Sequence, residues 1–327
     1  MGISEADLDR EINFYRSRAW AESTKRSYMS HRRAYLSFCL TMGYSPVPVT
    51  RMTLMRYVVF LARRLAPSSV KKYLNVVRIL HLEWGFPDPL KENWVLDTVL
   101  KGIARVKGLQ VNRKLPISPE ILLKLKAKLH LNDIVQANFW AICLVAFFGF
   151  FRKANLLPPS NNQFDGGKHL CRKDFSFFSK GLIISIRWAK TIQFAERLLS
   201  VPLPLLPGHP LCPVKAVLHA FSLTKGAPPA GPAFVVKKGG TWSSFPPGKF
   251  ISLLRTILLT VGLDASKFSG HSFRRGAASW ALRNSLPGEI IKILGDWKSD
   301  TYQNYLLLDH ETKVSSIFGF AGNLPTC

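Results

Sequence analysis

The fold of this chain is decided by a short stretch, Gly270-His271-Ser272-Phe273-Arg274-Arg275-Gly276. It places a histidine and an arginine three positions apart, so both side chains come near one face of a helix. An amphipathic run leads from there to Leu294-Gly295-Asp296-Trp297-Lys298-Ser299-Asp300-Thr301-Tyr302-Gln303-Asn304-Tyr305-Leu306. Cationic and hydrogen-bonding side chains at this density are suited to holding a phosphate group.

The composition indicates a folded and strongly basic protein. A length of 327 residues predicts two domains, and 47% hydrophobic residues exclude a disordered chain. Forty-five Lys and Arg against 20 Asp and Glu give a formal net charge of +25, which favours a polyanionic partner. Residues 1–114 carry 20 basic and nine acidic side chains, so both halves of the chain are basic.

Neither a secretory signal nor a membrane span is expected. The first residues lack a basic region followed by an apolar core, and the longest apolar run, 139–151, is too short to cross a bilayer. Five scattered cysteines have no metal-ligand spacing. We therefore expect a reducing compartment, with no bound metal, no cofactor and no small-molecule substrate.

Residues 1–110 are predicted to form a helical domain, because apolar residues recur at intervals of three and four. Breaks at Pro and Gly place the helices near 5–18, 23–41, 50–64, 67–85 and 90–107. Basic pairs open two of these helices, where the backbone dipole also favours phosphate. A DNA-contacting surface and a solvated basic helix face both explain these pairs, which are Lys25, Arg26, Lys71 and Lys72.

Residues 111–117 have no helical period and are predicted to be a linker to a second domain, 118–327. Period-two alternation then predicts three antiparallel strands. The fold class is mainly α with a small antiparallel β-sheet: a helical first domain followed by an α+β domain. In the second domain we expect helices near 118–129, 133–148, 213–223 and 248–261, strands near 173–178, 181–188 and 196–203, and a loop over 226–248 around an extended piece at 233–236.

Two further charged residues stand out, each with an ordinary structural explanation. Arg152 interrupts a strongly apolar segment, and is either a surface residue or a charge inserted for a purpose. Lys190 falls at an expected hairpin between the second and third strands, where a lysine is usually just solvated. Taken singly, His271 could cap a helix and Trp297 could belong to the core.

Taken in order, these residues resemble the active site of the tyrosine recombinases, the phage-integrase-like site-specific DNA recombinases. The matching positions are Arg152, Lys190, His271, Arg274, Trp297 and Tyr305. The first half of the chain resembles the core-binding domain of the family. Within the family, the stretches 151–156 and 295–300 are most similar to recombinases of eukaryotic mobile elements of the DIRS, Ngaro and Crypton type.

The chain departs from the family pattern at three positions. Trp297 replaces the histidine of many members, although its indole N–H can still donate a hydrogen bond. Asn155 stands where many members carry an acidic residue, which affects how Arg152 is oriented. The interval from Trp297 is eight positions to Tyr305, about one shorter than is common in the family, and only five positions to Tyr302. Tyr305 is therefore the better nucleophile candidate, and Tyr302 is the alternative.

The resemblance implies cleavage without metal or ATP. Tyr305 would attack the scissile phosphorus and form a covalent 3′-phosphotyrosyl bond. Arg152 and Arg274 would clamp the nonbridging oxygens, since a guanidinium binds oxyanions through paired donors. Lys190 would protonate the departing 5′ oxygen, His271 would donate a hydrogen bond or carry a proton, and Trp297 would donate from its indole.

The function implied is integration or excision of a mobile element by a DNA recombinase. Alternatives are a domesticated, inactive DNA-binding protein and a type IB topoisomerase-like enzyme. The implied partners are double-stranded DNA and further copies of this chain in a tetramer on paired sites. The tail, residues 306–327, would either pack on its own domain or dock as an exchange tail into a neighbouring subunit. Localisation would be nuclear for a eukaryotic protein and otherwise cytoplasmic on DNA.

Overall fold

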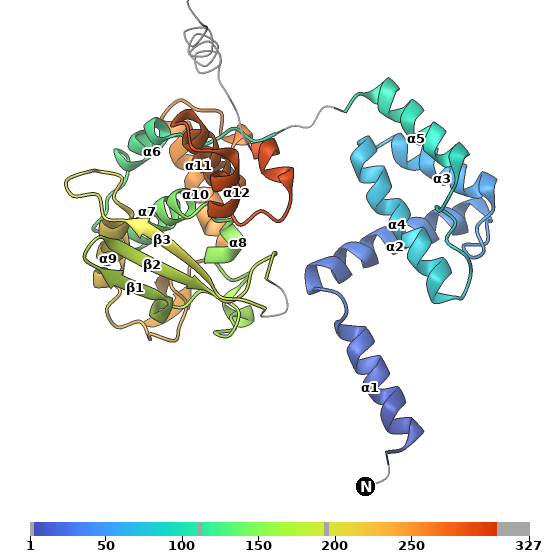
Figure 1. The fold of residues 1–327 in the computed structure, drawn as a ribbon, viewed down its shortest axis with the longest axis horizontal. Helices are drawn as coiled ribbons and strands as arrows, with labels where there is room; N and C mark the ends of the chain where they lie inside the picture. The colour runs from blue at the N-terminus through green and yellow to red at the C-terminus, as the bar shows by residue number, and fades with distance from the viewer. Residues whose placement is uncertain (1–2, 110–112, 193–195, 306–327) are drawn as a thin grey trace, which may run out of the picture. The chain divides into compact units, whose positions relative to one another are not determined.

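The computed structural model describes residues 3–109, 113–192 and 196–305, and the chain divides into two compact units, Met1–Asn112 and Arg113–Cys327 (Figure 1). The predicted fold class, mainly α with a small antiparallel β component, is confirmed. No helix among these described residues is both long and apolar enough to cross a membrane.

The first unit is helical. Its helices are α1 (Glu5–Arg18), α2 (Glu22–Met42), α3 (Arg51–Ala62), α4 (Pro67–Glu83) and α5 (Trp94–Lys107). The core of this unit lies between α2, α3 and α4, where the rings of Tyr35 and Tyr57 are fully buried and meet edge to face at 5.0 Å. The last predicted helix begins later than expected, because the Asn93 side chain caps it by accepting from the Leu96 N–H at 3.0 Å.

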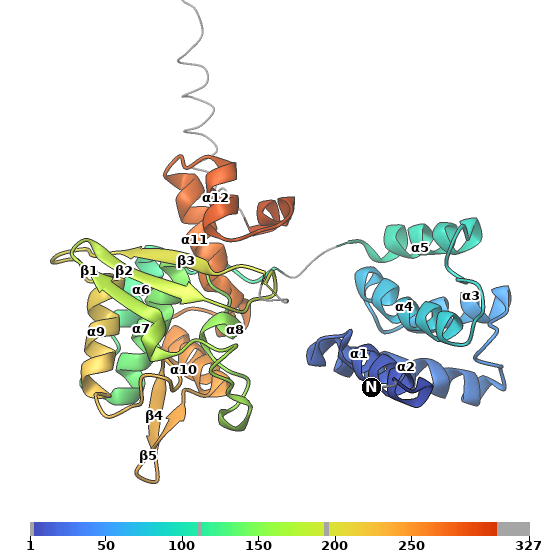
Figure 2. The same cartoon turned by 60° about the horizontal axis from the view of Figure 1, so that its bottom comes forward.

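The second unit is built around α7 (Ile134–Phe148), in which every residue from 137 to 147 is buried. A sheet with the order β1-β2-β3 lies against α7 and α9 (Figures 1 and 2). The other main elements surround this core, namely α6 (Pro119–Lys126), α8 (Lys153–Leu156), β1 (Phe175–Phe178), β2 (Gly181–Ile186), β3 (Leu199–Pro204), α9 (Pro213–Leu223), α10 (Pro247–Thr260), α11 (His271–Arg283) and α12 (Gly288–Leu294).

The region 226–248, predicted as a loop around an extended piece at 233–236, contains a hairpin. Strand β4 (Val235–Lys238) pairs antiparallel with β5 (Thr241–Ser244), and Gly239 and Gly240 join them with positive φ angles of 53° and 81°. Two such residues form the tight turn whose twist matches that of the flanking strands. The strand predicted from residue 173 also begins later, because Arg172–Asp174 form a 3₁₀ turn ahead of β1.

The linker predicted over 111–117 includes residues that belong to the second unit. The Leu115 N–H donates to the Lys267 carbonyl at 2.7 Å, and the Ile117 N–H donates to the Ser272 carbonyl at 2.9 Å. Residues 113–117 therefore belong to the second unit and lie against the start of α11, while 111 and 112 fall outside the described residues. The cause is a long-range pairing that the local sequence does not encode.

Gly276 makes this close approach possible, because a Cβ there would lie 1.8 Å from the Ile117 carbonyl oxygen. We expect Gly276→Ala to destabilise the second unit by about 1–3 kcal/mol through overpacking. The matched control is Gly248→Ala, since Gly248 also lies in a helix of this unit and has open space around it. Thermal unfolding of both variants checks this, and equal melting temperatures would contradict the role assigned to Gly276.

Candidate active site

Arg274 ties together three parts of the second unit. Its side chain projects from α11 and is 3% exposed. The guanidinium donates to the Phe150 carbonyl and, at 2.5 Å, to the Gly295 carbonyl. Its central carbon lies 3.7 Å from the centre of the Trp297 ring. A charge held this firmly in the interior is preorganised to stabilise an anion brought to it.

Arg152 follows α7 and is the N-cap residue that directly precedes the short helix α8. The residue is half-buried. This degree of burial falls between the two alternatives that the sequence left open, an exposed surface residue and a charge inserted into the interior. The Arg152 backbone N–H donates to the Asn155 side-chain oxygen at 3.0 Å. Asn155, which departs from the family pattern, therefore fixes the backbone at Arg152.

A small pocket brings the two arginines together with residues from distant parts of the sequence. Arg152 and Arg274 both line it, as do Ala189 and Thr191, the neighbours of Lys190 on either side. Arg152 and Arg274 are 122 positions apart in the sequence, so only the fold brings them together. The complete lining is Gly149, Phe151, Arg152, Asn155, Ala189, Thr191, Leu199, Val201, Arg274, Leu294, Gly295 and Asp296.

Lys190 lies in a tight turn beyond the end of β2, where a hairpin was expected. Ala189 and Ile192 exchange backbone hydrogen bonds of 3.1 and 3.0 Å and enclose Lys190 and Thr191 between them. The Lys190 side chain is exposed, whereas Ala189 is buried. Lys190 itself is not among the described residues that line the pocket, although its neighbours on both sides are.

His271 is the first residue of α11, and its backbone N–H donates to the Ser269 hydroxyl oxygen at 3.2 Å. Loss of water around the ring lowers the pKa of His271, and the positive charges of Arg152 and Arg274 lower this pKa further. The residue as a whole nevertheless keeps part of its surface open to solvent. At neutral pH the imidazole is therefore neutral, so it can accept one proton and donate another.

The aromatic residues of the last stretch differ in their placement. Trp297 is 6% exposed and lies between Arg274, the Phe150 ring and the Tyr302 ring, with both ring distances 6.3 Å. Its neighbour Asp296 lines the pocket, whereas Trp297 is absent from the lining formed by the described residues. The predicted donor role of Trp297 therefore stays a prediction.

Tyr302 belongs to the core of the second unit. It is 7% exposed, and a Cβ added at Gly288 would lie 2.6 Å from its hydroxyl oxygen. Tyr305 ends the 3₁₀ segment Asp300–Tyr305. The packing of Tyr302 supports the assignment of Tyr305 as the nucleophile, and the tail predicted for 306–327 lies outside the described residues.

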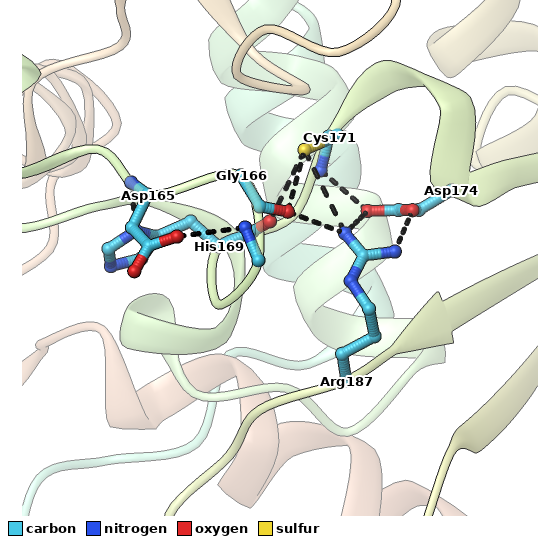
Figure 3. Close-up of polar contacts among 7 residues, drawn as sticks. Asp165, Gly166, His169, Cys171, Asp174 and Arg187 are labelled. Carbon is cyan, nitrogen blue, oxygen red and sulfur yellow. Dashed lines mark hydrogen bonds and ion pairs between the residues drawn. The ribbon is translucent and has the colours of Figure 1, made fainter. Parts of the chain in front are cut away.

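Sequence reasoning missed an ion pair at the base of the Lys190 turn. Figure 3 shows the Arg187 guanidinium reaching the carboxylate of Asp174, with one contact at 2.8 Å, and the Gly166 carbonyl at 3.1 Å. Asp174 is buried and also accepts from the Cys171 N–H at 2.7 Å. Both charged residues were expected within strands, so their pairing left no local signal. Among the described residues, no three His, Cys, Asp or Glu side chains lie together in a way that could hold a metal ion.

The predicted DNA-contacting lysines and arginine lie near one contact in the first unit. Tyr28 of α2 accepts from the Asn75 side chain of α4 at 3.1 Å. All four predicted residues are within four positions of this contact along their helices. Lys25 is half-buried and bonds Glu22 at 2.6 Å, while the others are exposed: Arg26, Lys71 and Lys72.

Known proteins resemble this chain in sequence and in fold, although no family model matches it. It is 24% identical over 272 residues to the integrase/recombinase XerD homologue of Selenomonas ruminantium, a match that covers 81% of this chain and 75% of the relative. The Tn1549 transposon integrase in complex with transposon right end DNA has a TM-score of 0.62 and 12% identity, covering 95% of this chain and 98% of that chain.

A second solved structure, a lambda integrase dimer bound to a COC′ core site, has a TM-score of 0.52 and 14% identity. This match covers 91% of this chain and 93% of that chain. At such identities the structural likeness shows the fold. Both matches extend over the two units of the chain.

Proposed function

We propose that the chain is a tyrosine recombinase that cuts and rejoins double-stranded DNA through a covalent 3′-phosphotyrosyl intermediate, to integrate or excise a mobile element. The sequence relative is named an integrase/recombinase, and solved structures with this fold are complexes with DNA. A net charge of +25 fits a polyanionic substrate.

The observation that carries the proposal is the shared pocket of Arg152 and Arg274, with the Lys190 turn at its edge. A scissile phosphate bound there would place its nonbridging oxygens against two permanently charged guanidinium groups. Negative charge that accumulates on those oxygens in the transition state would then be stabilised by groups already in place.

The reaction proceeds in one displacement. The Tyr305 oxygen bonds to phosphorus and loses its proton, and neutral His271 is suited to take up that proton. The bond from phosphorus to the 5′ oxygen breaks, and that oxygen takes a proton from the Lys190 ammonium. Attack by the 5′ hydroxyl of another strand reverses these transfers, so rejoining requires no ATP.

The first unit would hold DNA through its basic helix ends, among them Lys71 and Lys72, and the tail 306–327 would link copies of the chain into a tetramer on paired sites. The similarity of 151–156 and 295–300 to eukaryotic mobile-element recombinases supports an origin in such an element and a nuclear location.

A library selection tests the proposed reaction and identifies the target site in the same experiment. The protein is incubated with labelled short duplexes that carry a random central segment, and adducts that survive denaturation are isolated and sequenced. The enriched sequence is then rebuilt as a nicked duplex, whose short downstream piece diffuses away after cleavage and traps the adduct. We expect an adduct with the rebuilt site and none with a scrambled duplex. A protein that binds the rebuilt site and never forms an adduct would contradict the proposal.

A further inference from the structure

The chain within and after the Lys190 turn is bonded to one short segment, 296–298. The Thr191 hydroxyl donates to one carboxylate oxygen of Asp296, and Arg197 pairs with the other. Lys298 pairs with Glu196, with a nitrogen to oxygen distance of 3.6 Å. We call this set of five residues the clasp.

Among the charged residues of the clasp, Asp296 is the least exposed. Its side chain is 18% exposed, whereas the side chain of Arg197 is 40% exposed and that of Lys298 is 64% exposed. Exposed ion pairs contribute little, because water and salt screen them. The hydrogen bond between Thr191 and Asp296 is therefore the main contact of the clasp.

Asp296 is also fixed by its own backbone. Its φ of 51° is left-handed, a conformation that Asp and Asn tolerate better than most residues. The preceding residue, Gly295, accepts the hydrogen bond from Arg274, so the same turn of chain holds the phosphate-binding arginine. Burial raises the pKa of Asp296, but the hydrogen bonds from Thr191 and Arg197 outweigh it and leave the pKa lowered. Asp296 is an anion at neutral pH.

The opposite end of the turn is anchored independently. Arg187 directly follows β2, three residues before Lys190, and its ion pair with buried Asp174 fixes the chain there (Figure 3). The Lys190 turn is thus held at its base by Asp174 and beside Lys190 itself by Asp296.

We propose that Asp296 is a positioning residue that holds the Lys190 turn at the pocket through Thr191. This inference rests on the proposed function, in which the Lys190 ammonium gives its proton to the 5′ oxygen as the phosphorus–oxygen bond breaks. Proton transfer requires the donor within hydrogen-bond reach, and a misplacement of about 1 Å costs on the order of 100-fold in rate. Asp296 acts on the leaving group through the turn and touches no reacting atom.

Two variants weaken the clasp and two serve as controls. Thr191→Val removes the hydroxyl at nearly constant shape, and Asp296→Asn leaves a single acceptor oxygen where two donors meet, while tolerating the left-handed backbone. Thr191→Ser retains the hydroxyl. Asp300→Asn removes another acid of the same segment, one that pairs with Lys292 at 2.7 Å and has no role in the clasp.

The decisive substrate replaces the bridging 5′ oxygen with sulfur at the scissile phosphate. A thiolate leaves without a proton, because the thiol pKa is about 8.5. We expect Thr191→Val and Asp296→Asn to slow cleavage of ordinary DNA about 10-fold or more and to cleave the sulfur substrate near the wild-type rate. Both controls should match the wild type on both substrates. Equal slowing on the two substrates, or no slowing on either, would overturn the proposal.

A DNA-free measurement separates the clasp from the chemistry. Trypsin cuts after lysine only where the chain can open, so the rate of cutting after Lys190, followed by mass spectrometry, reports on the turn. We expect this rate to rise severalfold in Thr191→Val and Asp296→Asn and to stay unchanged in Thr191→Ser and Asp300→Asn. Unchanged cutting in the first two variants would overturn the inference while leaving the proposed function intact. If the wild type forms no adduct with either substrate, the proposed function fails together with the role of Lys190, and the trypsin rates still decide whether Asp296 holds the turn.

Discussion

Replacing Arg274 with alanine is expected to lower the rate of DNA strand cleavage by about 1000-fold. The loss is large because Arg274 is buried and rigidly placed, so its charge acts on the phosphate with little screening by water. Single-turnover cleavage of the nicked duplex, at saturating protein, measures the effect on the chemical step rather than on DNA binding.

The same substitution also affects the fold. The Phe150 and Gly295 carbonyls lose their donor, at a cost of about 1–3 kcal/mol for each buried group left without a partner. Arg274→Lys retains the charge but cannot reach both carbonyls and the phosphate, so it should remain strongly impaired. Arg275→Ala is the matched control. It removes the guanidinium next to Arg274 in the sequence, and that group donates to the Lys114 carbonyl at 2.9 Å. The assigned role of Arg274 is wrong if Arg274→Ala has the melting temperature of the wild type and cleaves DNA at the same rate as Arg275→Ala.

Tyr305→Phe should abolish the covalent adduct completely, because no oxygen remains to attack phosphorus. Tyr302→Phe should retain adduct formation, since the ring of Tyr302 fills the core beside Gly288 and Trp297. The pair of variants is well matched, as each loses one hydroxyl group from the same short segment. Adduct yield on denaturing gels distinguishes them, with DNA binding measured in parallel.

The reverse pattern would place the nucleophile at Tyr302 and would require that residue to leave the core before each reaction. An adduct that survives in both single variants would exclude the tyrosine assignment as a whole.

The larger features of the fold could be predicted because their signals are local. Every residue from 139 to 148 is apolar, and the helix is buried at every position from 137 to 147. The alternation of 181–186 indicated a strand of the sheet. Motif order along the chain likewise indicated the residues that line the pocket, Arg152 and Arg274, without any geometry.

Features that depend on contacts between distant residues could not be predicted in the same way. Thr191 and Asp296 are 105 residues apart, and nothing in the sequence around either one signals the other. The packing of 113–117 on α11 requires Gly276, a glycine whose need for space appears only in three dimensions. Hairpin β4–β5 did carry a signal, the Gly239-Gly240 pair between short extended runs, which the prediction of a loop overlooked.

The central claim is that Tyr305 becomes covalently bonded to DNA at the pocket of Arg152 and Arg274. Mapping the trapped adduct tests this most directly: the wild-type complex is digested with nuclease and protease, and the peptide carrying a nucleotide is sequenced by mass spectrometry. We expect one modified peptide, with the nucleotide on Tyr305 through a 3′ phosphate. A nucleotide on any other residue, or an unmodified protein recovered from DNA that it binds at the selected site, would contradict the central claim.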